Sequence, residues 1–344
     1  MVTIKVLIDS SFVGQANGIG VDTSNILSSL SGSETNNYEI EFRKKITSPF
    51  LIKGKKFLFT YFGKKTIIKS DNFQVFFQSQ VGVGIPSSTS TKWVVRIHDI
   101  FPITNPEWFT RSSVRYFRKS LEVALNHGAS LLFNSYSTKS EFEKFYPCIE
   151  NETMVWFCSE QNLQSPLCKE CAGCRNIQIS RNLKYFLSVG TIEPRKNYLE
   201  LLQSWKMLPQ NFTTNFALVI IGKYGWKARK DRMALQQAKY VNVLWIDNCC
   251  SGALNTLYLN AVAFISNGLN EGFDIPALEA RNYSRLPLIL RDIPVHNEIH
   301  PHGAHFFSDR KSLNQLLSKV EELDRPQVIK ISNNIRLLEA FFRK

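Results

Sequence analysis

Two adjacent cations stand where a strand leads into a predicted helix. Arg195 and Lys196 come just before Asn197, which with Glu200 would form a capping box at the helix start. Cations at this end of a helix oppose the helix dipole, which favours anions there. We therefore expect the pair to hold a multiply charged anion. A solvated pair without a ligand is the alternative.

Two carboxylates follow in a later loop, Glu271 and, eight residues on, Glu279. Pro276 suits the first position of a helix, so we expect Glu279 in the first helical turn. Carboxylates accept hydrogen bonds from hydroxyl groups, and the N–H groups at a helix start hold phosphate oxygens. The pair of cations and the two carboxylates together suit a nucleotide sugar as the ligand. The alternative is that the two carboxylates only favour the helix N-terminus electrostatically.

Two loops in the first half of the chain also follow predicted strands. Gly18 and Gly20 end a glycine-rich loop whose backbone N–H groups could approach a ligand, although many such turns are glycine-rich for packing alone. His98 ends an apolar strand, and the adjacent Asp99 could orient or charge its ring. A purely structural histidine is the alternative there.

The elements that must position these residues alternate along the chain. Short apolar runs separated by amphipathic stretches indicate parallel sheets covered on both faces, and ligands of such sheets bind beyond the carboxyl ends of the strands. The expected strands are 4–8, 38–42, 73–77, 93–97, 131–133, 154–157, 185–189, 217–221, 241–246, 263–266 and 286–290. The expected helices are 21–30, 110–126, 138–146, 198–207, 252–259, 276–283 and 327–342.

The length of 344 residues suits two domains. The predicted fold class is α/β, with two Rossmann-like, doubly wound domains facing each other across a cleft. The first domain would span 1–165 and the second 180–326, and the C-terminal segment 327–344 could pack back on the first domain.

Composition excludes several classes of protein. Apolar residues make up 44% of the chain, which excludes a disordered chain, and 13 Pro and 17 Gly exclude a coiled coil. No apolar run approaches the ~20 residues that a membrane-spanning helix needs. The first residues read as a strand rather than a signal peptide, so we expect a cytoplasmic protein.

The net charge is +13, and nine basic residues lie within 43–69, interleaved with aromatic residues. An anionic membrane surface, a nucleic acid and a solvated loop all fit this pattern. Glu271 and Glu279 argue against nucleic acid, because carboxylates at the site repel phosphates.

Seven cysteines are present, three of them in the run Cys168, Cys171 and Cys174, with Cys158 ten residues earlier. Such spacing can bind zinc or an iron–sulfur cluster. No fourth ligand stands at an established spacing, so we expect ordinary thiols and no metal. Cys249 and Cys250 are expected to be packed or loop thiols.

Several motifs resemble one family over nearly the whole chain. Val189–Asn197 resembles the V-G-x4-R-K-N loop of the retaining glycosyltransferases of family 4, which have the GT-B fold, and Glu271–Glu279 resembles their E-x7-E motif. Further segments match in order and spacing: Gly18–Gly20, His98–Asp99, Gly222–Trp226, Leu257–Tyr258 and Asp292–Glu298. The chain is similar in particular to bacterial mannosyl- and rhamnosyltransferases that build O-antigen or capsule.

The resemblance implies a role for each matching residue. Arg195 and Lys196 would hold the donor diphosphate and stabilise the leaving group. Glu279 would contact the ribose hydroxyls, and Glu271 the donor sugar. The remaining donor-site residues would be Gly272 and Phe273 in the motif, His98 beside the sugar, and Gly18 and Gly20 near phosphate or acceptor. No metal or cofactor other than the nucleotide sugar would be needed.

The implied activity is retaining transfer of a hexose to a glycan acceptor, with a lean to GDP-mannose as donor. The acceptor would be lipid-linked at the inner membrane surface, so the protein would be peripheral there, with 43–69 facing an anionic membrane or lipid diphosphate. A non-catalytic sugar-nucleotide-binding member, a nonhydrolysing epimerase or a phosphorylase are alternatives. Four departures from the family pattern bear on the donor: Val21-Asp22, Ser266-Asn267, Asp274 and Arg281–Pro287.

Overall fold

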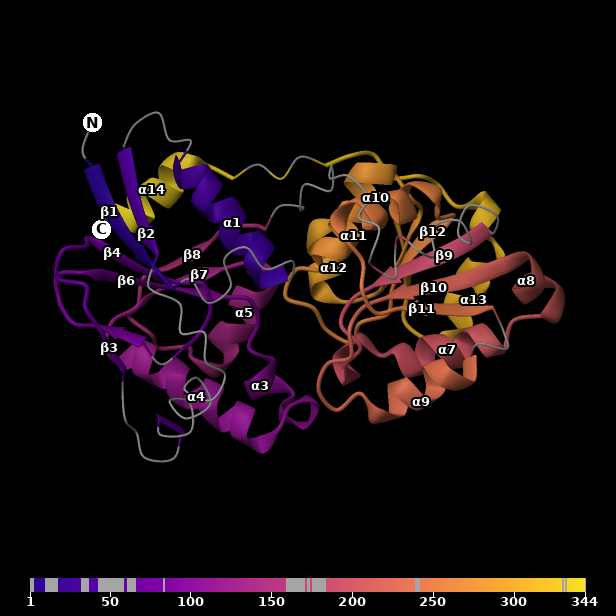
Figure 1. The fold of residues 1–344 in the computed structure, drawn as a ribbon, viewed down its shortest axis with the longest axis horizontal. Coiled ribbons are helices and arrows are strands. Elements are labelled where there is room, and N and C mark those ends of the chain that lie inside the picture. The colour runs from indigo at the N-terminus through magenta and orange to yellow at the C-terminus, as the bar shows by residue number, and fades with distance from the viewer. Residues whose placement is uncertain are drawn as a thin grey trace. The chain divides into compact units, whose positions relative to one another are not determined.

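A computed structural model describes residues 3–9, 18–31, 37–42, 59–60, 66–82, 84–158, 171, 174, 184–238, 242–329, 331 and 333–343. The chain divides into two compact units (Figure 1). Unit 1 comprises residues 1–159 and 331–344, and unit 2 comprises residues 160–330. The segment 43–69, apart from 59–60 and 66–69, lies outside the described residues, as does Cys168.

Unit 1 is built on a parallel sheet in the order β2-β1-β4-β6-β7-β8. The strands are β1 (Thr3–Ile8), β2 (Asn37–Phe42), β4 (Val75–Gln78), β6 (Lys92–Ile97), β7 (Ser130–Phe133) and β8 (Thr153–Val155), with a separate pair, β3 (Thr66–Ile68) and β5 (Gly84–Pro86). The helices are α1 (Gly18–Ser31), α3 (Phe101–Thr104), η1 (Pro106–Trp108), α4 (Arg111–Asn126), α5 (Tyr136–Phe145) and α14 (Ile335–Arg343).

Both faces of the unit 1 sheet are buried, because alternate residues of its strands point to opposite sides. In β4, Val75 and Phe77 pack with α1 and α14 on one face. Phe76, between them, packs with α4 and α5 on the other face. This two-sided burial explains why the strands are continuous apolar runs.

Unit 2 has its own parallel sheet, in the order β11-β10-β9-β12-β13-β14. The strands are β9 (Lys184–Val189), β10 (Phe216–Ile221), β11 (Val243–Ile246), β12 (Ala263–Ser266), β13 (Leu288–Arg291) and β14 (Ala304–Phe307). The helices are η2 (Pro194–Lys196), α7 (Tyr198–Lys206), α8 (Gln210–Asn215), α9 (Arg229–Ala238), α10 (Ser251–Asn260), α11 (Ile275–Ser284), α12 (Pro294–Ile299), α13 (Arg310–Ser318) and η4 (Val320–Glu322).

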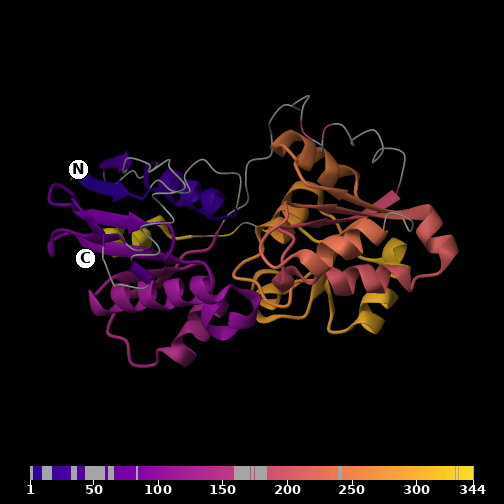
Figure 2. The same cartoon turned by 60° about the horizontal axis from the view of Figure 1, so that its bottom comes forward.

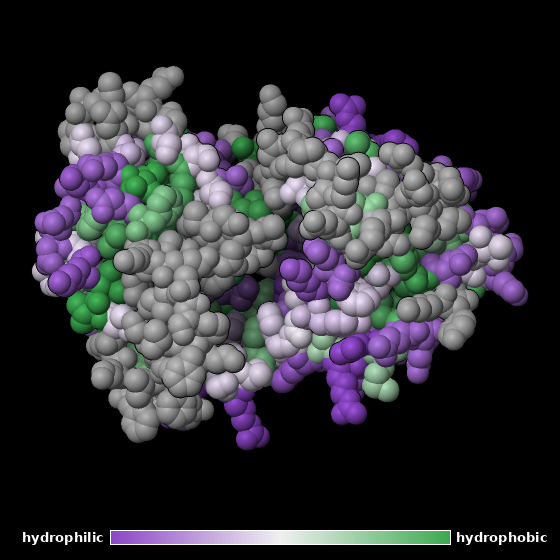
Figure 3. Space-filling view, in the orientation of Figure 1, coloured by the Kyte–Doolittle hydropathy of each residue, from purple (hydrophilic) through white to green (hydrophobic). Residues whose placement is uncertain are grey.

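The helices of unit 2 cover both faces of its sheet. Phe186 packs with α7, α9 and α13, whereas Tyr185 and Leu187 pack with α10 and α11, and both layers are visible (Figure 1, Figure 2). Hydrophilic side chains gather over the outer side of α9 (Figure 3), where Arg229 and Lys230 are exposed. Of the helices within the described residues, none is both long enough and apolar enough to cross a membrane.

All the strands expected from sequence are present, with ends shifted by a few residues. Several short or strongly polar elements were not predicted from the sequence: β3, β5, β14, α3, α8, α9, α12, α13 and the 3-10 helices η1, η2 and η4. The expected helix 327–342 was wrong at its start, because α14 begins only at Ile335. Ile329 is instead held in unit 2, where its backbone N–H and C=O both bond the Asn282 side chain at 3.0 Å.

Helix α14 offers a test of this packing, because two adjacent leucines differ in burial. Leu338 is fully buried, and Leu337 is 58% exposed. We expect Leu338→Ala to cost about 2–5 kcal/mol of unit 1 stability, since it leaves a cavity. Leu337→Ala should cost under about 0.5 kcal/mol. Urea unfolding of the two variants measures the difference, and equal losses would show that α14 is not packed through Leu338.

Candidate active site

The strand order of unit 2 reverses between β9 and β12, where two loops emerge side by side from the carboxyl edge of the sheet. A crevice at such a switch point is where doubly wound sheets bind ligands. The loop after β9 carries Arg195 and Lys196 in η2, and the loop after β12 carries Glu271 before α11. Sheet topology therefore brings together residues that lie about 75 positions apart in the chain.

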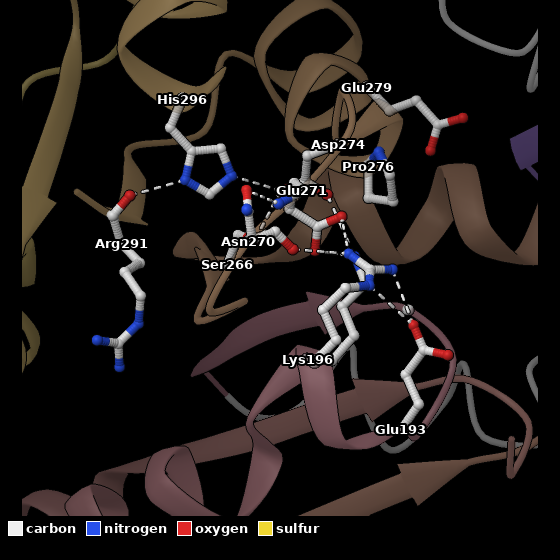
Figure 4. Close-up of polar contacts among 12 residues, drawn as sticks. Glu193, Lys196, Ser266, Asn270, Glu271, Asp274, Pro276, Glu279, Arg291 and His296 are labelled. Atoms are coloured by element: carbon white, nitrogen blue, oxygen red, sulfur yellow. Dashed lines mark hydrogen bonds and ion pairs between the residues drawn. The ribbon is translucent and has the colours of Figure 1, made fainter. Parts of the chain in front are cut away.

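The Glu271 carboxylate contacts both cations, and Figure 4 shows it beside Lys196. Its Oε2 accepts a hydrogen bond from Arg195 Nη1, and its Oε1 lies 2.6 Å from Lys196 Nζ. Arg195 also donates from Nε and Nη2 to Glu193 Oε1, at 3.2 and 2.8 Å. Lys196 Nζ lies 3.5 Å from Asp274 Oδ1. Three carboxylates thus surround two cations that are themselves largely buried.

Burial and the neighbouring charges shift the pKa values of these groups in opposite directions. Burial lowers the pKa of Lys196, but the Glu271 and Asp274 carboxylates outweigh it and raise that pKa above its usual value. Burial would likewise raise the pKa of Asp274, but Lys196 and His296 hold it far below its usual range. Lys196 is therefore charged and Asp274 ionised at neutral pH.

Asp274, which stands where the resembled family has Gly, has φ of 67°. Glycine adopts this left-handed conformation readily and other residues rarely do. The side chain of Asp274 accepts a hydrogen bond from Ser266 Oγ at 2.6 Å and lies 2.9 Å from His296 Nε2. Ser266 is a departure from the family pattern as well, so two departures seen in the sequence are bonded to each other.

Two hydrogen bonds to backbone carbonyls join the two loops. Leu269 N–H donates to the Arg195 carbonyl at 2.8 Å, and Asn267 Nδ2 donates to the Asn197 carbonyl at 2.8 Å. A Cβ at Gly268 would lie 2.6 Å from Glu271 Oε1, so a larger residue at this position would require the Glu271 carboxylate to move. Glu271 is thus held close against the chain of its own loop.

Glu279 lies on α11, apart from the ion pairs of Glu271 (Figure 4). Pro276 was expected as the first residue of this helix, but α11 begins one residue earlier, at Ile275, with Asp274 as its N-cap. Glu279 therefore lies just beyond the first helical turn, whereas it was expected within that turn. Tyr258 Oη on α10 donates to Glu279 Oε2 at 3.0 Å. Burial, with the Glu279 charge, raises the pKa of Tyr258 well above its usual value, so the hydroxyl keeps the proton it donates.

The expected capping box at Asn197 is wrong. Asn197 is the N-cap of α7, but its φ is 54° and its side chain makes no cap bond to the helix backbone. A capping side chain requires extended backbone at this position. The Asn197 amide instead donates to the Glu200 carboxylate, which also accepts from Arg291 Nη2 at 2.5 Å. Gly272 and Phe273, the other predicted donor-site residues of unit 2, are buried in the loop before α11.

In unit 1 a buried ion pair lies at the carboxyl end of β6. Arg96 Nε and Nη2 donate to the two carboxylate oxygens of Asp22, on α1, at 2.6 and 2.7 Å. The remaining Arg96 donors reach the carbonyls of Phe133 and Trp156, both at 2.8 Å. Arg96 outweighs the effect of burial and lowers the pKa of Asp22. In the sequence, Asp22 was named only as a departure from the family pattern, and its pairing with Arg96 was not predicted.

His98 lies beside this pair. Its Nε2 donates to the Ser79 carbonyl at 2.8 Å, and its Nδ1 lies 3.8 Å from Asp22 Oδ2. The carboxylate near the ring is therefore Asp22, whereas Asp99, expected to orient it, accepts the Phe101 N–H at the start of α3. Burial lowers the pKa of His98 against the opposing charge of Asp22, so the ring is neutral, with its proton on Nε2.

Gly18 and Gly20 were expected in a loop, and the structure corrects this. Helix α1 begins at Gly18, so both glycines lie in its first turn. Gly18 is exposed and Gly20 is buried. Residues 10–17, which precede them, lie outside the described part of the chain.

Two parallel, doubly wound sheets in one chain define the GT-B class of glycosyltransferase folds. The structure of Anabaena Alr3699/HepE in complex with UDP and glucose superposes with a TM-score of 0.59 at 13% identity, covering 93% of this chain and 90% of that one. Residues 175–336 match the family model of glycosyl transferases group 1.

Two curated relatives match at low identity. The O-antigen chain mannosyltransferase RfbU of Salmonella typhimurium is 26% identical over 242 residues, which is 70% of this chain and 63% of RfbU. The serotype-specific mannosyltransferase WbdA of Escherichia coli is 26% identical over 273 residues, 70% of this chain and 31% of WbdA. The matches thus span less than two thirds of the length of either relative.

The buried pair of unit 1 can be tested against an exposed pair in the same sheet. Asp22→Asn should destabilise unit 1 by about 3–5 kcal/mol, because it leaves the buried Arg96 charge uncompensated. The control is Glu39→Gln, which breaks a half-exposed pair with Lys5 and should cost at most about 1 kcal/mol. Denaturant unfolding compares them, and similar losses would contradict the role given to Asp22.

Proposed function

We propose that the protein is a retaining glycosyltransferase that moves a hexose from a nucleotide-diphosphate sugar to a glycan acceptor. The observation that carries the proposal is the charge cluster at the β9/β12 switch point. Arg195 and Lys196 supply two cations there. Glu271 accepts a hydrogen bond from Arg195 and forms an ion pair with Lys196. A site for a nucleotide sugar needs cations that bind the diphosphate and carboxylates that accept hydrogen bonds from the sugar hydroxyls.

Arg195 and Lys196 would bind the diphosphate and neutralise the charge that develops on it as the sugar leaves. The bond between the anomeric carbon and the phosphate oxygen breaks, and a bond from that carbon to the acceptor oxygen forms on the same face. The proton of the acceptor hydroxyl passes to the departing phosphate. The chemistry proposed requires no metal.

Glu271 would change partners when the donor binds. In this structure both of its oxygens face cations. A diphosphate would give Arg195 and Lys196 another anion, and Glu271 could then accept hydrogen bonds from sugar hydroxyls. Glu279, oriented by Tyr258, would accept from the ribose.

Unit 1 would supply the acceptor side. His98 would contact the sugar, and Gly18 at the start of α1 would lie near phosphate or acceptor. The Nε2–H of the neutral His98 ring donates to the Ser79 carbonyl. Nδ1 would therefore be available to accept a hydrogen bond. The ring would therefore orient a hydroxyl rather than supply positive charge.

For the donor we propose GDP-mannose, since the relatives RfbU and WbdA are both named mannosyltransferases. For the acceptor we propose a lipid-linked glycan of cell-surface polysaccharide synthesis, reached at the inner membrane surface from the cytoplasm. The basic segment 43–69 would contact that surface. Helix α4 adds a basic face, because Arg111, Arg115 and Arg118 are exposed and spaced by four and three residues.

A thermal-shift screen of nucleotide sugars, followed by a transfer assay, tests the proposal. A donor at 100 times its dissociation constant should stabilise the protein by about 2.7 kcal/mol. GDP-mannose should give the largest shift and support transfer with retained anomeric configuration. Binding without turnover would favour a non-catalytic member, and epimerised or phosphorolysed products would favour the other two alternatives.

The roles in the site predict distinct activity losses. Lys196→Ala should lower kcat by about 10²–10³-fold, the effect of removing one group that stabilises developing charge. Glu279→Ala should lower kcat/KM mainly by weakening donor binding. Lys206→Ala, at the exposed end of α7, is the control and should transfer at the wild-type rate. Steady-state kinetics on variants with unchanged circular dichroism decide this, and wild-type turnover by Lys196→Ala would refute the assignment.

The basic face of α4 predicts membrane binding. Replacing its three exposed arginines by Gln should weaken binding to vesicles of anionic phospholipid by about 1 kcal/mol per residue. Transfer to a soluble acceptor should be retained. A variant with three Gln at Lys206, Arg229 and Lys230 of unit 2 removes the same charge and is the control. Equal vesicle binding by the α4 variant and the wild-type protein would contradict the proposal.

A further inference from the structure

Three cysteine sulfurs converge in unit 2. The Sγ atoms of Cys171, Cys174 and Cys250 all lie within 4.8 Å of one another, and those of Cys174 and Cys250 are 3.6 Å apart. Cys171 and Cys250 are separated by 79 positions in the chain. The sequence showed only the C-x2-C spacing of the first two, and the fold adds Cys250 from the loop between β11 and α10.

Backbone N–H groups point at these sulfurs. Cys171 Sγ accepts hydrogen bonds from the N–H of Cys174 and of Cys250, both at 3.3 Å. Cys250 is the N-cap of the ten-residue helix α10, and its Sγ accepts the Ala253 N–H at 3.4 Å. A thiolate is the form of cysteine that binds metal, and hydrogen-bond donors and a helix N-terminus favour that form.

The surroundings are unlike those of cysteines that serve as small core residues. Cys171 and Ala253 form a satellite cluster of their own, against which Cys174, Cys249 and Cys250 pack. The two main cores of unit 2 are formed by other buried residues, mostly large aliphatic and aromatic ones. Cys158, the other thiol near this run in the sequence, lies in unit 1 with its Sγ 3.6 Å from Arg96 Nη2.

We propose that Cys171, Cys174 and Cys250 bind a structural zinc ion. Zinc–sulfur bonds of about 2.3 Å in a tetrahedron place the sulfurs roughly 3.8 Å apart. The sulfurs of Cys174 and Cys250 are 3.6 Å apart, and all three lie within 4.8 Å of one another. Three thiolates leave one position of the tetrahedron for a further ligand. This site is separate from the charge cluster at Glu271 and takes no part in the transfer chemistry.

Such a zinc ion would connect the segment at Cys171 to the start of α10. The same helix carries Tyr258, which donates to Glu279. Because structural zinc binding contributes directly to folding free energy, the ion would hold α10, and with it Tyr258, in place beside Glu279.

Metal analysis of the purified full chain tests the proposal. Protein expressed with zinc and purified in reductant without chelator should contain about one zinc per chain. Cys171→Ser and Cys250→Ser should each lose it. Cys148→Ser, which changes an exposed cysteine of unit 1, should retain it. Full zinc in Cys171→Ser, or iron with acid-labile sulfide in the wild-type protein, would overturn the proposal.

A second measurement on the wild-type chain does not depend on the variants folding. Alkylation followed by peptide mass mapping should find Cys171, Cys174 and Cys250 protected by zinc and reactive after chelation, with Cys148 reactive throughout. Cobalt added to the chelated protein should produce thiolate-to-cobalt absorption. Zinc-independent reactivity, or a disulfide between Cys174 and Cys250 in place of bound metal, would refute the site.

Discussion

The contact of Glu271 with Arg195 and Lys196 is the interaction on which the candidate site depends. It joins the loops that leave two neighbouring strands, and it pairs one carboxylate with two largely buried cations. Removing one partner of such a group leaves an uncompensated buried charge, which lowers the stability of the folded protein. The surrounding features, from Gly268 to the bond between Leu269 and the Arg195 carbonyl, serve to keep this carboxylate in place.

Each unit uses a similar arrangement at the carboxyl edge of its sheet. In unit 1 a buried aspartate, Asp22, pairs with Arg96 and lies near His98. In unit 2 a buried aspartate, Asp274, faces Lys196 and His296. In both units cations lower the pKa of the aspartate despite its burial. Two of the departures from the family pattern, at positions 22 and 274, are these aspartates.

The strands, and the loops after them that carry the candidate site residues, were predictable from local signals. Continuous apolar runs predict parallel strands that are buried on both faces. Of the predicted site residues that follow such strands, Arg195, Lys196 and Glu271 lie together at the β9/β12 switch point. The predicted residues His98, Gly18 and Gly20 lie in unit 1 instead. Local signals failed where backbone conformation was decided by tertiary contacts. Asn197 and Asp274 both take left-handed φ values, so one capping box was absent and one helix began earlier than expected.

The sequence by itself determined the two α/β sheets, the charged motifs and their order along the chain, because periodicity and composition are local properties. Only the tertiary structure decided which charges meet. The carboxylate beside His98 is that of Asp22 and not that of Asp99. Tyr258 donates to Glu279. The sulfur of Cys250 lies near those of Cys171 and Cys174. These contacts join residues far apart in the chain, and their distances follow from strand order and helix packing, which no local pattern encodes.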